Sequence, residues 1–174
     1  MRKEYRKAVR EVFAEAVRER LPQFERLKVQ SPVLFGGESV FRWKVDQALH
    51  CFVILVPDPQ GRQAFTVELA WSRAARFPEV TSRPTHLLAP DDPDPVDDEE
   101  GIVRLGAIAE RRDIWWHLPD PALENPGDFR ALQQSLEPLS APVAREDAAD
   151  PVAVSVNILA RSGADFFDAL AHRR

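Results

Sequence analysis

An almost continuously apolar stretch at residues 49–56 constrains the fold of this chain more than any other feature. Its length and scarcity of polar positions favour a central β-strand covered on both faces, although periodicity alone does not exclude a helix. A turn-like segment, Pro57-Asp58-Pro59-Gln60-Gly61, follows it. Beyond the turn, apolar residues alternate with polar ones, as in a half-buried strand, at Phe65, Val67, Leu69 and Trp71. The pattern predicts a β-hairpin.

Shorter strands are expected on both sides of this hairpin. Residues 41–45 alternate between apolar and charged, and residues 27–29 do so over a shorter stretch. Residues 102–105 and 114–118 are two further short strand candidates. We therefore expect a mixed, mainly antiparallel sheet of about five strands.

Helices are expected at the N-terminus and after residue 128. Apolar residues recur every three or four positions from residue 5 to residue 21, and Pro22 ends the pattern. Asp128 is placed to cap a second helix. The apolar stripe of that second helix comprises Phe129, Leu132, Leu136 and Leu139.

The C-terminal segment fits two periodicities, because residues 152–159 alternate like a strand and also repeat like a helix. We favour the helix, since Asp150-Pro151 is typical of a cap followed by a first helical residue and Gly163 suits a helix end. A short last helix would bring Phe166, Phe167 and Leu170 into the core. The chain is thus expected to form one α+β domain over residues 1–174, with N- and C-terminal helices packed on the sheet.

The charge of the chain is concentrated in one segment. The net charge is −5, but residues 91–100 hold seven acids and no base, and without them 23 bases face 21 acids. A nucleic-acid-binding domain would show a broad basic surplus, so nucleic acid is an unfavoured partner. Four prolines and the repulsion between like charges predict a flexible acidic loop at about residues 84–100.

Nothing in the sequence predicts a membrane or secretory protein. No apolar run approaches the roughly 20 residues that span a bilayer, and the first twenty residues contain no continuous apolar segment. Cys51 is the single cysteine, so an intrachain disulfide cannot form. A reducing cytoplasm is the compartment that this pattern favours.

Motifs for catalysis, cofactor binding and metal binding are missing from the sequence. It contains no glycine-rich phosphate loop and no nucleophile elbow, and its four histidines lack metal-site spacing. His50 and Cys51 are neighbours on an expected strand, so their side chains point to opposite faces and do not form a nucleophile–base pair. The acidic run also fails the EF-hand pattern. We therefore expect no cofactor and no metal, and favour a non-catalytic protein.

Two tryptophans stand next to each other in an expected strand. One must face away from the other, so the second indole is either covered by a helix or exposed, where tryptophan is enriched among binding hot spots. Together with the acidic run, the pair predicts a surface that binds another protein, in particular a basic one. This predicted partner-binding set comprises Asp91, Asp92, Asp94, Asp97, Asp98, Glu99, Glu100, Trp115 and Trp116.

The order of the expected elements resembles that of a bacterial family. An Arg-Leu-Gly element at residues 104–106, the tryptophan pair and a closing Gly-Ala-Asp-Phe-Phe at residues 163–167 are similar to the bacterial domain-of-unknown-function family 4304. The acidic insertion departs from that family. Some such families sit among toxin–immunity genes, so the resemblance implies an immunity-type inhibitor of a basic toxin and implies no catalytic residues.

Two other functions stay open. A small-ligand-binding protein or an enzyme would use a pocket of arginine and tryptophan side chains, for which a deep polar cleft would be the structural sign. A nucleic-acid-binding module would show an affinity that falls steeply with salt. The residues that carry this alternative ligand-binding set are Arg73, Arg76, Arg111 and Arg112, next to Trp115. The oligomeric state is not indicated.

Overall fold

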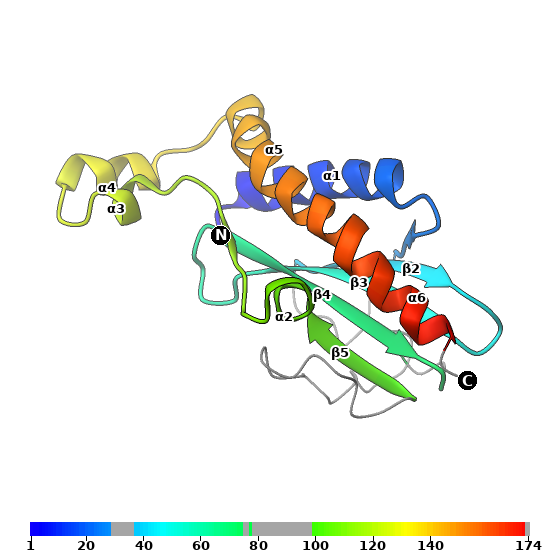
Figure 1. Cartoon of the computed structure of the whole chain (residues 1–174). Helices are drawn as coiled ribbons and strands as arrows, with labels where there is room; N and C mark the ends of the chain where they lie inside the picture. Colours follow the sequence, from blue (N-terminus) through cyan, green and yellow to red (C-terminus); the bar gives the residue numbers. More distant parts are fainter. Residues whose placement is uncertain (29–36, 75–76, 78–98, 173–174) are drawn as a thin grey trace.

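A computed structural model describes residues 1–28, 37–74, 77 and 99–172 (Figure 1). The predicted acidic loop at 84–100 lies outside these residues except for its last two positions. Along the chain, the elements are α1 (Lys3–Arg20), β1 (Glu25–Arg26), β2 (Ser39–Lys44), β3 (His50–Pro57), β4 (Ala64–Ser72), β5 (Glu100–Arg104), α2 (Leu105–Glu110), β6 (Trp116–His117), α3 (Pro121–Glu124), α4 (Phe129–Leu136), α5 (Ala141–Ile158), the π-helical η1 (Leu159–Gly163) and α6 (Ala164–His172).

The strands form one antiparallel sheet in the order β1-β2-β3-β4-β5, which confirms the predicted α+β class. The short β6 pairs with the beginning of β4, and β5 pairs with its end. The described residues therefore hold six strands where about five were expected, and two of these strands are only two residues long. The predicted hairpin is β3–β4, in which Cys51 lies opposite Trp71.

The central strand β3 is buried on both faces, as its apolar run predicts. Alternate residues Cys51, Val53 and Leu55 belong to the main core under the helices. The residues between them point to the opposite face, where a second apolar cluster includes Phe52 and Phe77. These two rings meet edge to face with their centroids 5.0 Å apart.

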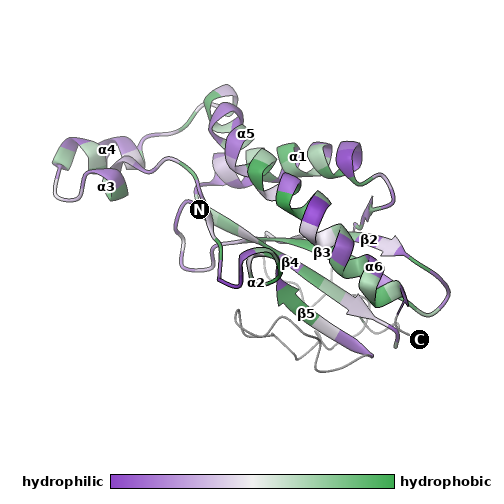
Figure 2. Ribbon diagram, viewed as in Figure 1, coloured by the Kyte–Doolittle hydropathy of each residue, from purple (hydrophilic) through white to green (hydrophobic). Residues whose placement is uncertain are grey.

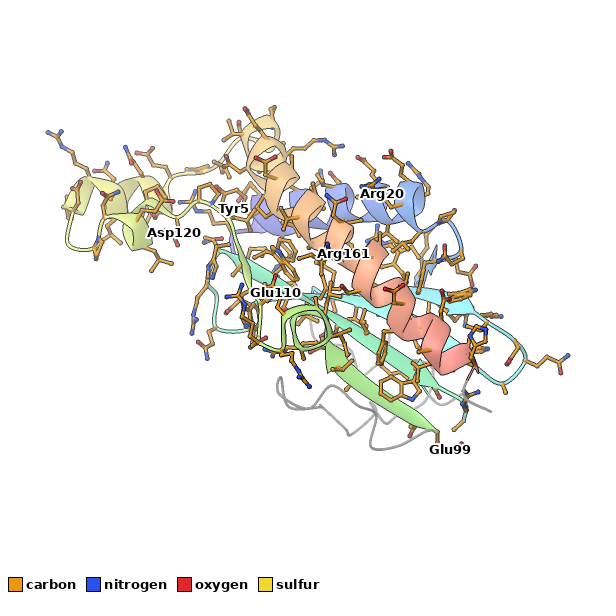
Figure 3. The ribbon with its side chains drawn as sticks, in the orientation of Figure 1. Tyr5, Arg20, Glu99, Glu110, Asp120 and Arg161 are labelled. Atoms are coloured by element: carbon orange, nitrogen blue, oxygen red, sulfur yellow. The ribbon has the colours of Figure 1, made fainter. Side chains whose placement is uncertain are left out.

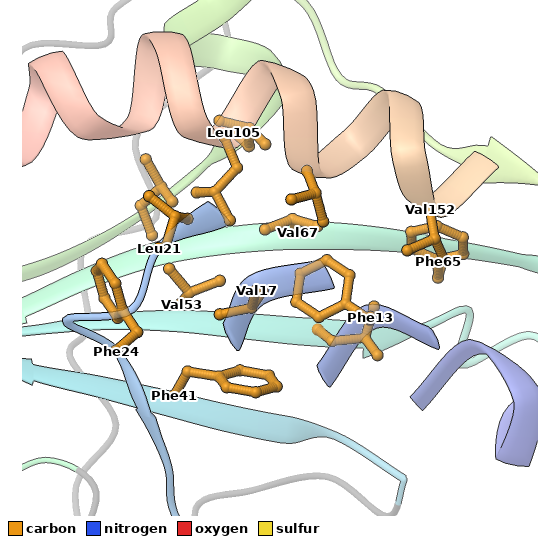
Figure 4. Packing of buried hydrophobic residues seen from close by; sticks show 14 of the residues in the cluster. Phe13, Val17, Leu21, Phe24, Phe41, Val53, Phe65, Val67, Leu105 and Val152 are labelled. Atoms are coloured by element: carbon orange, nitrogen blue, oxygen red, sulfur yellow. The ribbon is translucent and has the colours of Figure 1, made fainter. Parts of the chain in front are cut away.

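Helices α1 and α5 lie side by side over one face of the sheet (Figure 1). Figure 4 shows how Phe13 and Val17 of α1 fill the space between the sheet and the helix layer. The ring of Phe13 packs 5.7 Å from that of Phe41 on β2. The two helices are also joined by a hydrogen bond from the Tyr5 hydroxyl to Asp147 Oδ2, 2.7 Å long.

The C-terminal segment is helical, as favoured, but its predicted boundaries are wrong. Helix α5 begins at Ala141, ten residues before the predicted start, and continues through Pro151. Burial explains this, because Ala144, Ala148 and Val152 form a fully buried stripe whose packing outweighs the hydrogen bond lost at a proline. Gly163 does not end the helix either, since η1 joins α5 to α6 without a break.

The strand candidates near residue 110 have bounds that differ from those expected. Strand β5 ends at Arg104, and Leu105 already begins α2, a helix that the sequence did not predict. Of residues 114–118, only Trp116 and His117 pair as a strand. Residues 27–29 were also expected as a strand, but the pairing lies just before them, at Glu25–Arg26, and residue 29 is outside the described part.

Because Cys51 is buried, we expect the free energy of unfolding to fall at alkaline pH. Desolvation raises the pKa of its thiol from 9.0 to about 12, against a smaller opposing effect of Arg73. Because the unfolded thiol loses its proton first, stability should fall above pH 9 by about 1.4 kcal/mol per pH unit and level off near pH 12. Urea unfolding of the wild type and of Cys51→Ala at pH 8, 9 and 10 checks this. An equal pH dependence of the two proteins would contradict it.

Candidate functional site

Only two members of the predicted acidic surface lie within the described residues. Asp91, Asp92, Asp94, Asp97 and Asp98 lie outside them, whereas Glu99 and Glu100 stand at the start of β5. The backbone carbonyl of Glu99 accepts a hydrogen bond of 2.6 Å from the Arg73 amide. Glu100 Oε2 lies 3.5 Å from the Ser72 hydroxyl that donates to it. Both acids therefore contact the end of β4.

The tryptophan pair is divided between core and surface. Trp116 is 7% exposed and stacks on Phe65 with ring centroids 5.7 Å apart. Trp115 is half-buried, and the guanidinium of Arg104 lies 5.0 Å from its ring centroid. The Trp115 indole N–H donates to Asp113 Oδ2 at 3.1 Å, and Arg104 also bonds this oxygen. The half-exposed indole is thus held by an internal cation and carboxylate.

The described arginines of the alternative ligand set lie at two different places. Arg73 donates to the carbonyl of Leu170 in α6 over 2.8 Å. Arg112 donates through Nε to Glu110 over 2.8 Å, and Arg111 is an exposed residue with a left-handed φ of 54° after α2. The five-residue strand β5 separates the two places by roughly 13 Å. Arg76 lies outside the described part of the chain.

The part of the chain that the structure describes contains neither a metal-binding cluster nor a membrane-spanning helix. No group of three or more His, Cys, Asp or Glu side chains is arranged there to hold a metal ion. No helix there has both the length and the apolarity to cross a bilayer.

A surface that the sequence did not point to is formed by the helical hairpin α3–α4. The hairpin projects from the sheet and helices of the body (Figure 1). Its two helices pack on each other and pack extensively on no other described element. A hydrogen bond from Arg2 to the Gln134 carbonyl, 3.0 Å long, joins the hairpin to α1.

The hairpin is held together by polar contacts at its root. Asp120 caps α3 by accepting from the Ala122 amide, and it also accepts from the Ser135 hydroxyl of α4 at 2.8 Å. Ser135 in turn accepts from the Ala122 amide at 2.9 Å. Asp128 caps α4 as predicted, by accepting from the Arg130 amide. Figure 3 shows Asp120 at the root of the hairpin.

These contacts turn the apolar stripe of α4 toward solvent. Ser135 and the buried Ala131, four residues apart, form the face of α4 directed at α3. On another face, Phe129 is 76% exposed, Leu132 48% and Leu136 78%. We call these three residues the ridge; Figure 2 shows apolar residues interrupting the polar surface of the hairpin. Leu123 of α3 is also largely exposed.

The ridge is a candidate binding surface because it reverses the usual arrangement of an amphipathic helix. Burying one Leu or Phe side chain contributes about 1.5–3 kcal/mol, so three exposed together forgo several kcal/mol of stabilisation. Contiguous apolar patches on monomers are small unless they bind something. The sequence contains this apolar stripe, and its periodicity suggests a helix that faces the core. Periodicity identifies an apolar face but does not indicate what covers it.

Comparison with family models, curated proteins and solved structures gives no match for this chain. The resemblance to family 4304 therefore remains a prediction.

Proposed function

We propose that this chain is a non-catalytic protein-binding module that contacts its partner through the α3–α4 hairpin. The observation that supports this most directly is the ridge, in which Phe129 and Leu136 each expose about three quarters of their surface. Their spacing with Leu132, at i, i+3 and i+7, is the pattern by which amphipathic helices enter apolar grooves.

The construction of the hairpin also supports a binding role. Both helices begin with an aspartate cap, and hydrogen bonds of Ser135 join the two, so the hairpin presents an ordered surface. A preformed surface binds more tightly because less conformational entropy is lost on association. A cytoplasmic setting is part of the proposal, since it keeps Cys51 as a thiol.

The more specific function, an immunity-type inhibitor of a basic toxin, rests on the acidic segment. Five of its seven acids lie outside the described residues, so this role stays a prediction that the hairpin neither requires nor opposes. The ridge and the acidic segment are separate in the sequence, and the experiment below tests the ridge alone.

Photo-crosslinking tests the hairpin as the contact surface. A photoreactive phenylalanine analogue at exposed Gln133 should give a specific adduct on irradiation, either with the purified chain or in lysate of the source cells. The adduct should fall at least about tenfold with Phe129→Ser and Leu136→Ser combined, because apolar anchors carry most of the binding energy.

The matched control places the same analogue at Gln47, an exposed glutamine in the turn between β2 and β3. This control should give no adduct that depends on the ridge. Absence of any adduct at position 133, or an adduct of equal yield in the ridge variant, would overturn the proposed function.

A further inference from the structure

The hairpin is not the only apolar surface of the described chain. A groove of about 560 Å³ lies between α1 and the beginning of α5. Ala8, Leu139 and Pro142 contribute its apolar lining, and Lys3, Lys7 and Arg145 its cationic side chains. Glu4 and Glu11 also line it, the latter 3.9 Å from Lys7 in an ion pair.

We infer that the partner of the ridge is a second copy of this chain, whose α1–α5 groove receives α4. This inference rests on the proposed function and names its partner. Each copy carries one ridge and one groove, so a two-fold axis lets both ridges be buried at once in a reciprocal exchange of hairpins.

Charge complementarity favours this occupant. Residues 120–137, which form the hairpin and its ends, contain four acids and one base, a net charge of −3. The charged side chains that line the groove are three bases, on Lys3, Lys7 and Arg145, and two acids, on Glu4 and Glu11, a net charge of +1. A hairpin laid in the groove of a neighbour therefore meets a surface of opposite charge, which speeds encounter and disfavours other orientations.

The shapes and areas also fit. Helix α4 has eight residues and is about 12 Å long, so its three anchors span the two turns that a helix-binding groove typically contacts. A specific interface buries at least roughly 1,000 Å² in total, which in a symmetric pair is about 500 Å² per ridge–groove contact. The exposed part of Phe129 supplies about 150 Å² of this, and the two leucines and the groove walls supply more.

The apolar surface continues from the ridge toward the groove. Leu139 lies in the linker between α4 and α5 and lines the groove, and the neighbouring Val143 on α5 is 44% exposed. The root of the hairpin and the groove therefore adjoin within one chain, which places two hairpins side by side when two copies exchange them.

Sedimentation velocity of the purified full chain, from low to high micromolar concentration, tests the inference. The wild type should pass from the 19.7 kDa monomer to a dimer as concentration rises. Phe129→Ala removes the ridge anchor, and Ala141→Trp fills the groove at an exposed position. Each should weaken dimerisation about 30-fold or more. Val154→Ala, which shortens a half-exposed apolar side chain on α5, is the control and should leave dimerisation unchanged.

Mixing the two weakened variants gives the sharpest result. The Phe129→Ala copy keeps its groove and the Ala141→Trp copy keeps its ridge, so together they restore one of the two contacts. A heterodimer should therefore form at concentrations at which each variant alone is monomeric. A wild type that stays monomeric throughout, a groove variant that dimerises like the wild type, or a mixture without heterodimer would each overturn the second-copy inference.

Failure of this inference can be told apart from failure of the proposed function. In purified protein, the photoreactive chain should give an adduct of twice the chain mass. A ridge-dependent adduct that forms only in lysate, with a different protein, would overturn the second copy and leave the proposed function standing. Absence of any ridge-dependent adduct would overturn both.

Discussion

Substitution of Phe13 by alanine should lower the free energy of unfolding by about 3–5 kcal/mol, because it removes a fully buried ring from a close-packed core. Phe13 has no exposed surface and lies at the centre of the contact between α1 and the sheet (Figure 4). Its neighbour Phe41 sits on a strand that is bonded to β3 and cannot move in to fill the cavity. Total stabilities are about 5–15 kcal/mol, so this single change removes a large share.

Substitution of Phe129 by alanine should instead affect association and leave the stability of the monomer nearly unchanged. Because this ring is 76% exposed, Phe129→Ala should change the stability of the monomer by less than about 0.5 kcal/mol while it weakens association. Urea unfolding at a concentration low enough to keep both variants monomeric provides the comparison. A loss of several kcal/mol at Phe129 would show that the ridge packs on the body of its own chain.

This pair of phenylalanines shows what the sequence could reveal. Both stand in stripes of helical period, and both helices form where the pattern predicts them. The stripe of α1 meets the apolar face of a sheet that its own chain supplies. The stripe of α4 does not, because the contacts of Ser135 and Asp120 direct another face toward α3. Periodicity therefore predicted the helix and missed the candidate site.

Local signals predicted elements better than boundaries. The β3–β4 hairpin was predictable because the apolar run of the first strand, the turn and the alternation of the second strand agree. The predicted helix bounds were wrong because Pro151 usually marks the start of a helix and Gly163 its end. Here both residues lie inside a continuous helical segment.

The tryptophan pair was predicted in part. Alternation along the chain required Trp115 and Trp116 to face opposite ways, and they do. What sequence could not supply is the contact of Arg104 and Asp113 with the outward indole, because those residues come from β5 and from the connection after α2. Asp113 is two residues from Trp115 in the sequence and Arg104 is eleven, so the fold of α2 between them decides how the outward indole is held.

Gly106→Ala should destabilise the protein by about 2–3 kcal/mol, although replacing glycine by alanine within a helix ordinarily stabilises by up to about 1 kcal/mol. Gly106 is buried near the start of α2, where the chain returns past it after Arg111. A Cβ there would lie 2.5 Å from the Arg112 carbonyl oxygen and 2.8 Å from the Ile114 amide nitrogen. Both are backbone atoms, which cannot swing aside as the end of a side chain can.

The loss of stability in Gly106→Ala follows from the elements that the segment after Arg111 positions. The strand segment after Ile114 carries Trp116 into the core and then leads to Pro119 and the root of the hairpin, so displacement of the backbone there disturbs β6 as well as α2. Ala109→Gly, in the same helix, provides the control, because it reports the helix propensity of α2 without a close contact. Urea unfolding of both variants separates the two effects. A neutral or stabilising Gly106→Ala would show that the close approach relaxes freely and that this glycine reflects no packing constraint.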